Sequence, residues 1–249
     1  MENSLGVWGD DMAEPYFFWK GIDSRVMGVV VTNLPPIIRP KERVLEKVAT
    51  GRPGAYHFTE GEDIYDSYAK PCQCYLRPSA SKDAFLAWLR GGGRVVFSNE
   101  PTKAYIARVD NQISLDKLLA NYEHRSFTAP FVVEPFKYQA VADADIERTV
   151  SGQSITNPGT VASKPIIKVE GSGDITLTVG GVYIELNDIS GGIIIDCTLP
   201  DCFNLDKTAL INNQVTGNFS LISLPAGVSS VHWTGSVTKV TITPNWRWL

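Results

Sequence analysis

Apolar residues recur at helical spacing in one short segment of the chain. Phe85, Trp88 and Leu89 are separated by three and four positions, so in a helix they share one face. Ser81 is a suitable N-cap residue, and Gly91 can adopt the left-handed C′ conformation that follows many helices. The pattern therefore predicts a short helix between Ser81 and Gly91. A helix of this length is not stable alone, so we expect its apolar face to pack on a sheet.

Alternating and β-branched runs predict strands on both sides of this helix. The predicted strands are 27–32, 55–58, 72–77, 95–97 and 105–109, with a turn at 99–103. The prolines of LPPIIRP restrict that segment to an extended or edge conformation. The apolar spacing of QISLDKLLANY, residues 112–122, would also fit a short helix.

The C-terminal part of the chain consists of short β-branched runs separated by Gly, Asn, Asp and Pro. Ile175, Leu177 and Val179 alternate with threonines, which places them on one face of a strand. The runs recur about every ten residues, a spacing typical of a β-sandwich. They are IIKVEG, DITLTVGG, VYIELND, GGIIIDCTL, NFSLISL, SVHWTG and KVTITP.

Charge density divides the chain into two differently built parts. Residues 1–150 carry 38 charged side chains and residues 151–249 carry 12. A chain of 249 residues is long enough for two domains. We expect the join within 138–156, where the apolar patterning is weak. The sequence thus predicts two β-rich domains.

Composition argues against nucleic-acid binding and against membrane association. The formal net charge is −4 and the pI is about 5.4, so a basic surface that grips nucleic acid is not expected. No apolar run is long enough to span a bilayer. The N-terminus MENSLGVWGDD lacks the basic region and apolar core of a signal peptide. We expect a protein made in a cytoplasm.

Candidate metal-binding and nucleophilic side chains are few and poorly spaced. The histidines are His57, His124 and His232, and the cysteines are Cys72, Cys74, Cys197 and Cys202. The histidines lie in separate segments, and a C-x-C pair and a C-x4-C pair in different domains are not the spacing of a zinc site. We expect buried thiols, with a Cys197–Cys202 disulfide as the alternative.

The glycine-rich and acidic segments do not predict an enzyme either. Gly91–Arg94 follows a helix and precedes a strand, which is the reverse of a phosphate-binding loop. The G-x-S-x-G motif of serine hydrolases does not occur. The acids at 10–11 and 60–63 lie in polar surroundings, without the spacing that would predict the facing carboxylates of a glycosidase. We expect no catalytic residue, no cofactor and no metal.

Tryptophans are concentrated near the C-terminus, at Trp233, Trp246 and Trp248. Exposed tryptophan rings stack on the apolar faces of sugars, so Trp233 and Trp246 are the candidate carbohydrate or partner contacts. Packing in a core or at a subunit contact is the favoured alternative for both.

The segment from Phe85 to Val109 combines a W-L helix, a glycine-rich exit, an S-N-E-P turn at 98–101 and a Y-I-A-R strand at 105–108. Further motifs are GIDS at 21–24, GRPG at 51–54 and SFTAPFVVEPFKY at 126–138. In this order they resemble the distal tail protein (Dit) family of long, non-contractile-tailed bacteriophages. The stretch from NPGTVASKP to GSVTKVTITPNWRWL resembles the galectin-like C-terminal domain of many members. The resemblance favours a strand over a helix at 112–122.

The resemblance implies a mainly β fold. Residues 1–140 would be a ring-forming domain, a β-sandwich or barrel-like structure with one short helix, and residues 141–249 a galectin-like β-sandwich. It implies a structural, non-enzymatic protein of the virion, at the phage tail tip, assembled in the cytoplasm of the bacterial host.

The implied partners are other virion components. Six copies would form a ring that joins the tail tube protein to the tail hub or tail-associated lysin protein, with the receptor-binding protein as a further partner. Phage DNA would pass through the channel without specific binding. The alternative is a carbohydrate-binding adaptor that contacts host cell-surface polysaccharide through the C-terminal domain.

Overall fold

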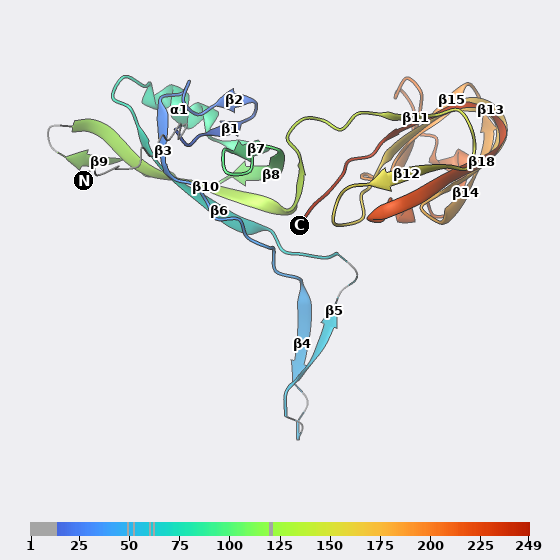
Figure 1. Cartoon of the computed structure of the whole chain (residues 1–249), viewed down its shortest axis with the longest axis horizontal. Coiled ribbons are helices and arrows are strands. Elements are labelled where there is room, and N and C mark those ends of the chain that lie inside the picture. The colour runs from blue at the N-terminus through green and yellow to red at the C-terminus, as the bar shows by residue number, and fades with distance from the viewer. Residues whose placement is uncertain (1–13, 49, 52, 60, 62, 120–121) are drawn as a thin grey trace, which may run out of the picture. The chain divides into compact units, whose positions relative to one another are not determined.

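The computed structural model describes residues 14–48, 50–51, 53–59, 61, 63–119 and 122–249. The described chain is mainly β with one α-helix, as the sequence predicts (Figure 1). It divides into two compact units. The first contains the described part of Met1–Ile38 together with Ser67–Glu134, and the second contains Arg39–Asp66 and Pro135–Leu249. No helix among the described residues is long and apolar enough to cross a membrane.

One sheet of eight strands builds the first unit. Its order is β2-β1-β7-β8-β10-β6-β3, and β9 pairs with β10. The strands are β1 (Phe17–Trp19), β2 (Ile22–Asp23), β3 (Val29–Asn33), β6 (Tyr68–Leu76), β7 (Gly91–Phe97), β8 (Lys103–Val109), β9 (Asp116–Leu119) and β10 (Tyr122–Gln139). Segments far apart in sequence are therefore neighbours, with Phe17 opposite Phe97 and Ala129 opposite Cys72.

Helix α1 (Lys82–Trp88) covers the aromatic core of this sheet. The Ser81 hydroxyl accepts a hydrogen bond from the Ala84 amide at 3.3 Å, which confirms the predicted N-cap. The Phe85 ring lies 4.7 Å from that of Phe127, and the Trp19 indole donates a 3.0 Å hydrogen bond to the Trp88 carbonyl. The apolar face of the helix thus packs on the sheet, as its spacing predicts.

The helix ends earlier than its glycine signal predicts. Leu89 is the C-cap residue, so Gly91 is not at the C′ position. Gly91 does adopt a positive φ of 71°, but it is already paired with Val109 of β8. The strand predicted at 95–97 therefore begins earlier, because ladder pairing with β8 incorporates all three glycines into β7. Residues 116–119 form a strand, as the resemblance favoured over a helix.

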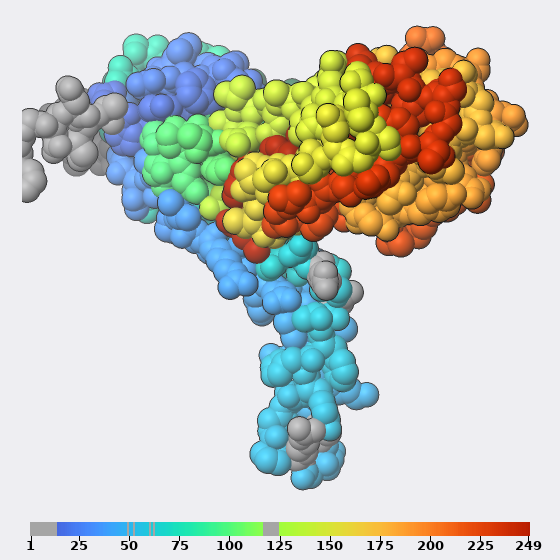
Figure 2. Space-filling view, turned by 45° about the vertical axis from the view of Figure 1, so that its right-hand side comes forward, coloured from blue at the N-terminus to red at the C-terminus, as the bar shows by residue number. Residues whose placement is uncertain are grey.

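A separate two-stranded hairpin pairs β4 (Val44–Val48) with β5 (Ala55–Thr59). Only β5 was predicted from the sequence. The base of the hairpin is closed by an isolated bridge between Glu42 and Tyr65 and by a hydrogen bond of 2.9 Å from the Arg43 amide to the Ile64 carbonyl. Most of its side chains are exposed, as the light-blue and cyan segment in Figure 2 shows.

The second unit contains a further sheet of eight strands. Its order is β11-β18-β13-β14-β17, with β12 on β18 and with β15 joining β13 to β16. The elements are β11 (Ile146–Arg148), β12 (Gln153–Asn157), β13 (Ile166–Val179), β14 (Val182–Ile189), β15 (Gly192–Asp196), β16 (Asp201–Asn204), β17 (Val215–Thr216) and β18 (Gly227–Thr243), with 3-10 helices η1 (Asn212–Gln214) and η2 (Phe219–Leu221). The long strand β13 pairs with β15 over 166–170 and with β14 over 173–179, and its pairing with β18 shifts register between these two stretches.

Two details of this unit differ from the sequence prediction. The runs IIKVEG and DITLTV form one long strand, β13, as SVHWTG and KVTITP do in β18. The run NFSLISL contains η2 instead of a strand. The Lys164 ammonium donates hydrogen bonds to the Ser220 and Ile222 carbonyls at 2.7 and 3.2 Å, which satisfies main-chain groups that a neighbouring strand would otherwise pair.

Candidate functional site

The two tryptophans predicted as sugar or partner contacts lie in the core of the second unit. Trp233 is 9% exposed and Trp246 is 7% exposed. Trp233 lies opposite Leu177 of β13, and the Ser151 hydroxyl is 2.9 Å from both its amide and its carbonyl. This burial favours core packing, because little ring surface is left for a ligand. A contact role for these rings stays a prediction.

The four cysteines are buried free thiols. Burial raises the pKa of Cys197 and of Cys202 to about 12. A hydrogen bond with Cys72, together with burial, also raises the pKa of Cys74. The thiols of Cys74, Cys197 and Cys202 are therefore protonated at neutral pH, and a protonated, buried thiol is neither a nucleophile nor a metal ligand.

The described residues contain no cluster of three or more His, Cys, Asp or Glu side chains that could hold a metal ion. The imidazole Nδ1 of His57 lies 3.6 Å from Glu46 Oε1 on the hairpin, and His232 lies on β18. The side chain of His124 and the acids Asp10, Asp11, Glu60 and Glu62 lie outside the described residues.

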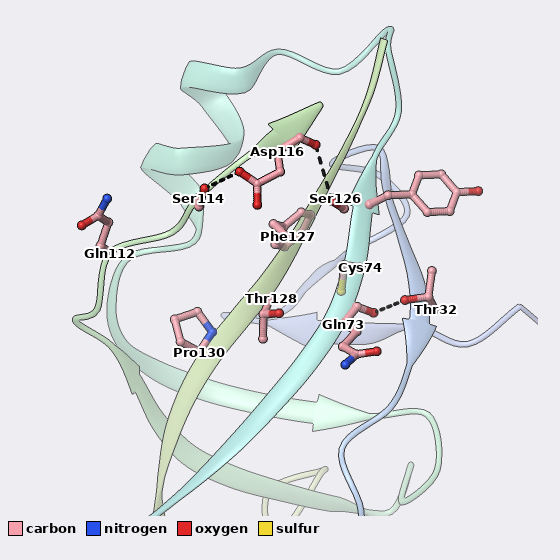
Figure 3. Close-up of a pocket in the computed structure, with 11 residues that line it drawn as sticks. Thr32, Gln73, Cys74, Gln112, Ser114, Asp116, Ser126, Phe127, Thr128 and Pro130 are labelled. Carbon is pink, nitrogen blue, oxygen red and sulfur yellow. Dashed lines mark hydrogen bonds between the residues drawn. The ribbon is translucent and has the colours of Figure 1, made fainter. Parts of the chain in front are cut away.

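A groove of about 550 Å³, which we call the Thr32 groove, lies where β3, β6 and β10 run side by side in the first unit (Figure 3). The Ser114 hydroxyl donates to Asp116 Oδ1 at 2.7 Å, and the Thr32 hydroxyl donates to the Gln73 carbonyl at 3.0 Å. The lining residues include no histidine, lysine or arginine that could activate a hydroxyl or bind an oxyanion. The groove therefore presents hydroxyl and carboxylate groups beside a larger apolar surface.

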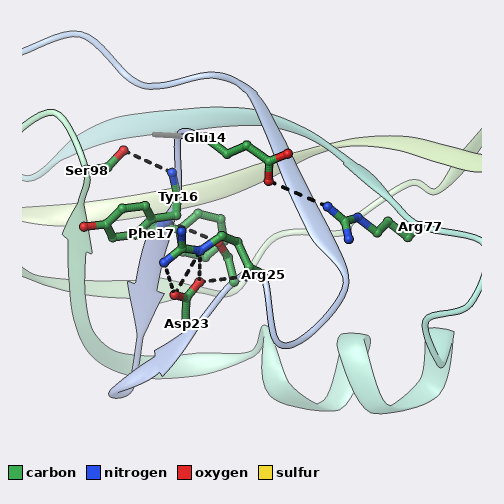
Figure 4. A network of polar contacts seen from close by, with 8 residues as sticks. Glu14, Tyr16, Phe17, Asp23, Arg25, Arg77 and Ser98 are labelled. Atoms are coloured by element: carbon green, nitrogen blue, oxygen red, sulfur yellow. Dashed lines mark hydrogen bonds and ion pairs between the residues drawn. The ribbon is translucent and has the colours of Figure 1, made fainter. Parts of the chain in front are cut away.

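The GIDS motif, residues 21–24, consists of β2 and one turn residue on either side of it (Figure 4). Asp23 accepts hydrogen bonds from the Arg25 amide at 2.8 Å and from its guanidinium at 2.6 Å, and this pairing holds the pKa of Asp23 below its usual value. The Arg25 guanidinium also lies 4.3 Å from the centroid of the Tyr16 ring. Ser24 is fully buried and accepts a hydrogen bond from the Phe17 amide at 3.2 Å. The motif is structural.

The S-N-E-P turn joins three segments of the first unit. The Ser98 hydroxyl accepts a hydrogen bond from the Tyr16 amide at 3.0 Å. The Asn99 side-chain amide donates to the Pro35 carbonyl at 3.0 Å, and Glu100 accepts a hydrogen bond from the Tyr105 hydroxyl. The residues of this motif therefore hold the sheet to the proline-rich segment that precedes the hairpin.

A buried lysine reinforces the same attachment. Lys70 is 1% exposed, its ammonium donates a 2.8 Å hydrogen bond to the Pro36 carbonyl, and it lies 4.6 Å from the centroid of the Tyr105 ring. Burial raises the pKa of Tyr105, as does its hydrogen bond to Glu100. Sequence reasoning missed this cluster because the predicted strand began at residue 72. The alternation of β6, extended two residues back, places Lys70 on the buried face with Cys72 and Cys74.

A second groove, of about 490 Å³, crosses β7, β8 and β10. We call it the Gly92 groove, because Gly92 of β7 leaves it open: a Cβ atom there would have only the Ala107 carbonyl oxygen within 4 Å. Ile106 and Val132 supply apolar surface, and Glu134 supplies a charge. Glycine within a strand often marks a close approach by another chain or ligand.

The hairpin exposes a row of apolar side chains on one face. Leu45 is 57% exposed, Phe58 53% and Tyr56 43%. Leu45 lies opposite Phe58, and the Tyr56 and Phe58 rings stack with centroids 6.2 Å apart. We call these three residues the hairpin stripe. An isolated two-stranded hairpin is marginally stable in water, and clustered exposed apolar residues mark interaction sites.

Comparison with known proteins connects this architecture to a solved structure. No family model matches the sequence, and no curated protein matches it. The fold is similar to the crystal structure of the SPP1 Dit (gp 19.1) protein, described as a paradigm of the hub adsorption apparatus in phages that infect Gram-positive bacteria. The TM-score is 0.72 at 13% sequence identity, and the match covers 94% of this chain and 99% of that chain. The chain therefore has a Dit-like fold.

Proposed function

We propose that this chain is a structural, non-enzymatic virion protein of a phage tail tip, with the role of a distal tail protein. The observation that carries the proposal is the fold similarity, which extends over 94% of this chain and 99% of the SPP1 Dit protein. β-Sandwich modules are common and host many functions, so a match to one unit would carry little weight. A match over both units, in the same order, supports a shared architectural role.

In this role six copies form a closed ring through head-to-tail contacts. Residues 1–140 form the ring, and the galectin-like residues 141–249 serve as the platform for other tail-tip components. The ring joins the tail tube protein to the tail hub or tail-associated lysin protein, with the receptor-binding protein as a further partner. A net charge of −4 supports passage of DNA through the channel without specific binding.

We propose no catalytic activity for this chain, and the side chains that line the two grooves of the first unit support this part of the proposal. The Cys74 thiol of the Thr32 groove has a raised pKa, so it is not a thiolate nucleophile at neutral pH. Polar hydroxyls and amides are suited to a wet protein–protein contact.

Electron microscopy of the purified protein, alone and with its tail hub protein, tests the proposal. We expect six-lobed rings, and light scattering should give six times the chain mass of 27.3 kDa. The tail tube protein should bind the same ring. Particles that stay monomeric at every concentration, and that never join the hub, would contradict the proposal.

A second candidate role, contact with host cell-surface polysaccharide, is favoured by Tyr183 of the second unit. This ring is 53% exposed, and its hydroxyl donates a 2.9 Å hydrogen bond to Glu185. Tyr183 lies opposite Thr178 of β13, which lies opposite His232 of β18, so an exposed ring is surrounded by polar groups. An aromatic plane beside hydrogen-bonding groups suits a sugar ring.

Titration with host cell-wall polysaccharide tests this second role. Tyr183→Ala should abolish binding, and Trp233→Phe, which keeps an aromatic ring in the core, should retain it. The reverse result would restore the Trp233 hypothesis, and no binding by the native protein would eliminate the role.

A further inference from the structure

We propose that the hairpin stripe of one copy docks into the Gly92 groove of the next copy, and that this repeated contact builds the ring. The inference rests on the proposed function, because it names the contact through which the chain binds itself. The occupant of the groove is thus a second copy of this chain.

The hairpin stripe needs a cover that its own strands do not provide. Leu45, Tyr56 and Phe58 remain 43–57% exposed in the single chain, so the chain does not bury its own stripe. The centre of the opposite hairpin face is occupied by the Glu46–His57 ion pair, at 3.6 Å. The stripe is therefore the face that gains most from leaving water.

The Gly92 groove offers a complementary surface. A strand residue other than glycine at position 92 would place its side chain in the groove, and the 3.9 Å distance to the Ala107 carbonyl shows that the backbone itself would tolerate one. The open space is therefore not imposed by packing within the sheet. Ile106, 37% exposed, and Val132 present apolar surface there for an incoming leucine or phenylalanine.

Charge complements shape at this contact. Lys47 lies opposite Tyr56 and so shares the stripe's face of the hairpin. Among the described residues, neither Lys47 nor Glu134 takes part in an ion pair, whereas Arg108 at the groove pairs with Asp110 at 3.1 Å. Glu134 is therefore the uncompensated charge beside the groove, and an incoming Lys47 compensates it.

The geometry of the pairing allows a ring. The stripe and the groove are different patches of the same chain, so copies can dock head to tail in a heterologous contact. Each copy can then receive one neighbour and be received by another. Such contacts close into a ring when the rotation between copies permits.

A charge-reversal cycle tests the contact. Lys47→Glu and Glu134→Lys should each raise the protein concentration at half-assembly about tenfold, and the double variant should recover most of the loss. Lys82→Glu, on the exposed surface of α1, is the matched control and should assemble normally. Gly92→Leu should fill the groove and prevent assembly while the thermal melting temperature stays close to that of the native protein.

A cross-linking experiment gives a readout that does not require a stable ring. Leu45→Cys protein mixed with Ile106→Cys protein should form a mixed disulfide dimer under mild oxidation, and either variant alone should not. Suppose the native protein forms rings, but the single charge variants assemble normally or no mixed disulfide forms. Either result would overturn the inference and leave the proposed function standing. Single variants that assemble but no longer bind the hub would assign the stripe to the hub. A native protein that never assembles would instead defeat the proposed function itself.

Discussion

Lys70 and Pro36 are joined by a hydrogen bond between a buried ammonium group and a main-chain carbonyl. The two atoms lie 2.8 Å apart, and the lysine side chain is 1% exposed. A buried charge is costly unless it is compensated, and here the carbonyl and the faces of Phe97 and Tyr105, at 5.6 and 4.6 Å, compensate it. The bond fixes the extended segment at Pro36 to β6 of the first unit.

Lys70→Met should lower the free energy of unfolding of the first unit by about 1–3 kcal/mol, because the Pro36 carbonyl loses a charged donor. Urea denaturation followed by tryptophan fluorescence measures the change. Lys82→Met, an exposed substitution on α1, is the control and should have little effect. If Lys70→Met is as stable as the native protein, or more stable, then the free-energy cost of burying the ammonium group equals or exceeds the stabilisation from its contacts.

Tyr68→Phe should leave the protein equally or slightly more stable at neutral pH. The Tyr68 hydroxyl is buried without a hydrogen-bond partner among the described residues, so its removal relieves an unsatisfied group. Burial, with a smaller contribution from Glu100, raises the pKa of Tyr68 to about 12.

The raised pKa of Tyr68 also predicts a pH dependence. The unfolded tyrosine releases its proton near pH 10, whereas the folded one holds it to about 12, so the native state loses stability as pH rises between these values. Denaturation at several alkaline pH values should show this decline, and Tyr68→Phe should reduce it. A decline of the same size in both proteins would mean that Tyr68 is not its source.

The predictable parts of the fold are those with one buried face. Phe85, Trp88 and Leu89 revealed α1 because their spacing matches a single apolar side. β4 was missed for the opposite reason: nearly all of its side chains are exposed, so no burial period appears in VLEKV. A strand with most side chains exposed on both faces leaves no apolar alternation in its sequence.

The candidate surfaces were less predictable than the fold. The glycines at 91–93 read as a helix stop, and only their pairing with β8 shows that they open a groove. The sequence predicted the tryptophans as candidate ligand contacts. Without the register of a strand, the sequence does not tell which of its side chains face the core and which face solvent.

Trp233→Ala should therefore act on stability before it acts on any ligand. The side chain is 9% exposed within the core of the second unit, and truncating a buried aromatic residue typically costs about 3–5 kcal/mol. Thermal melting measures the loss, and Tyr183→Ala, at a 53% exposed position, is the matched control with little expected change. A Trp233→Ala protein with an unchanged melting temperature would place the ring outside the core.

The C-terminal residues hold the end of β10 within the second unit. Lys137 and Trp248 exchange main-chain hydrogen bonds of 2.8 and 2.9 Å. The Arg247 guanidinium lies 4.4 Å from the Phe136 ring and donates through Nε to the Ala162 carbonyl at 3.0 Å. Burial lowers the pKa of Arg247 from its ordinary value.

Deletion of residues 247–249 should therefore increase hydrogen exchange at the Lys137 amide, because its acceptor, the Trp248 carbonyl, is removed. Arg247→Ala should have a smaller effect, since it keeps the main-chain pairing, and Arg247→Lys should recover only part of it because lysine lacks the planar fork. Deletion of Leu249 alone removes the hydrogen bond from its amide to the Thr160 hydroxyl but keeps Trp248 and its pairing with Lys137, and is the control. Protection of Lys137 that survives the longer deletion would show that the end of β10 is held by other contacts, and that the terminal residues follow this strand without fixing it.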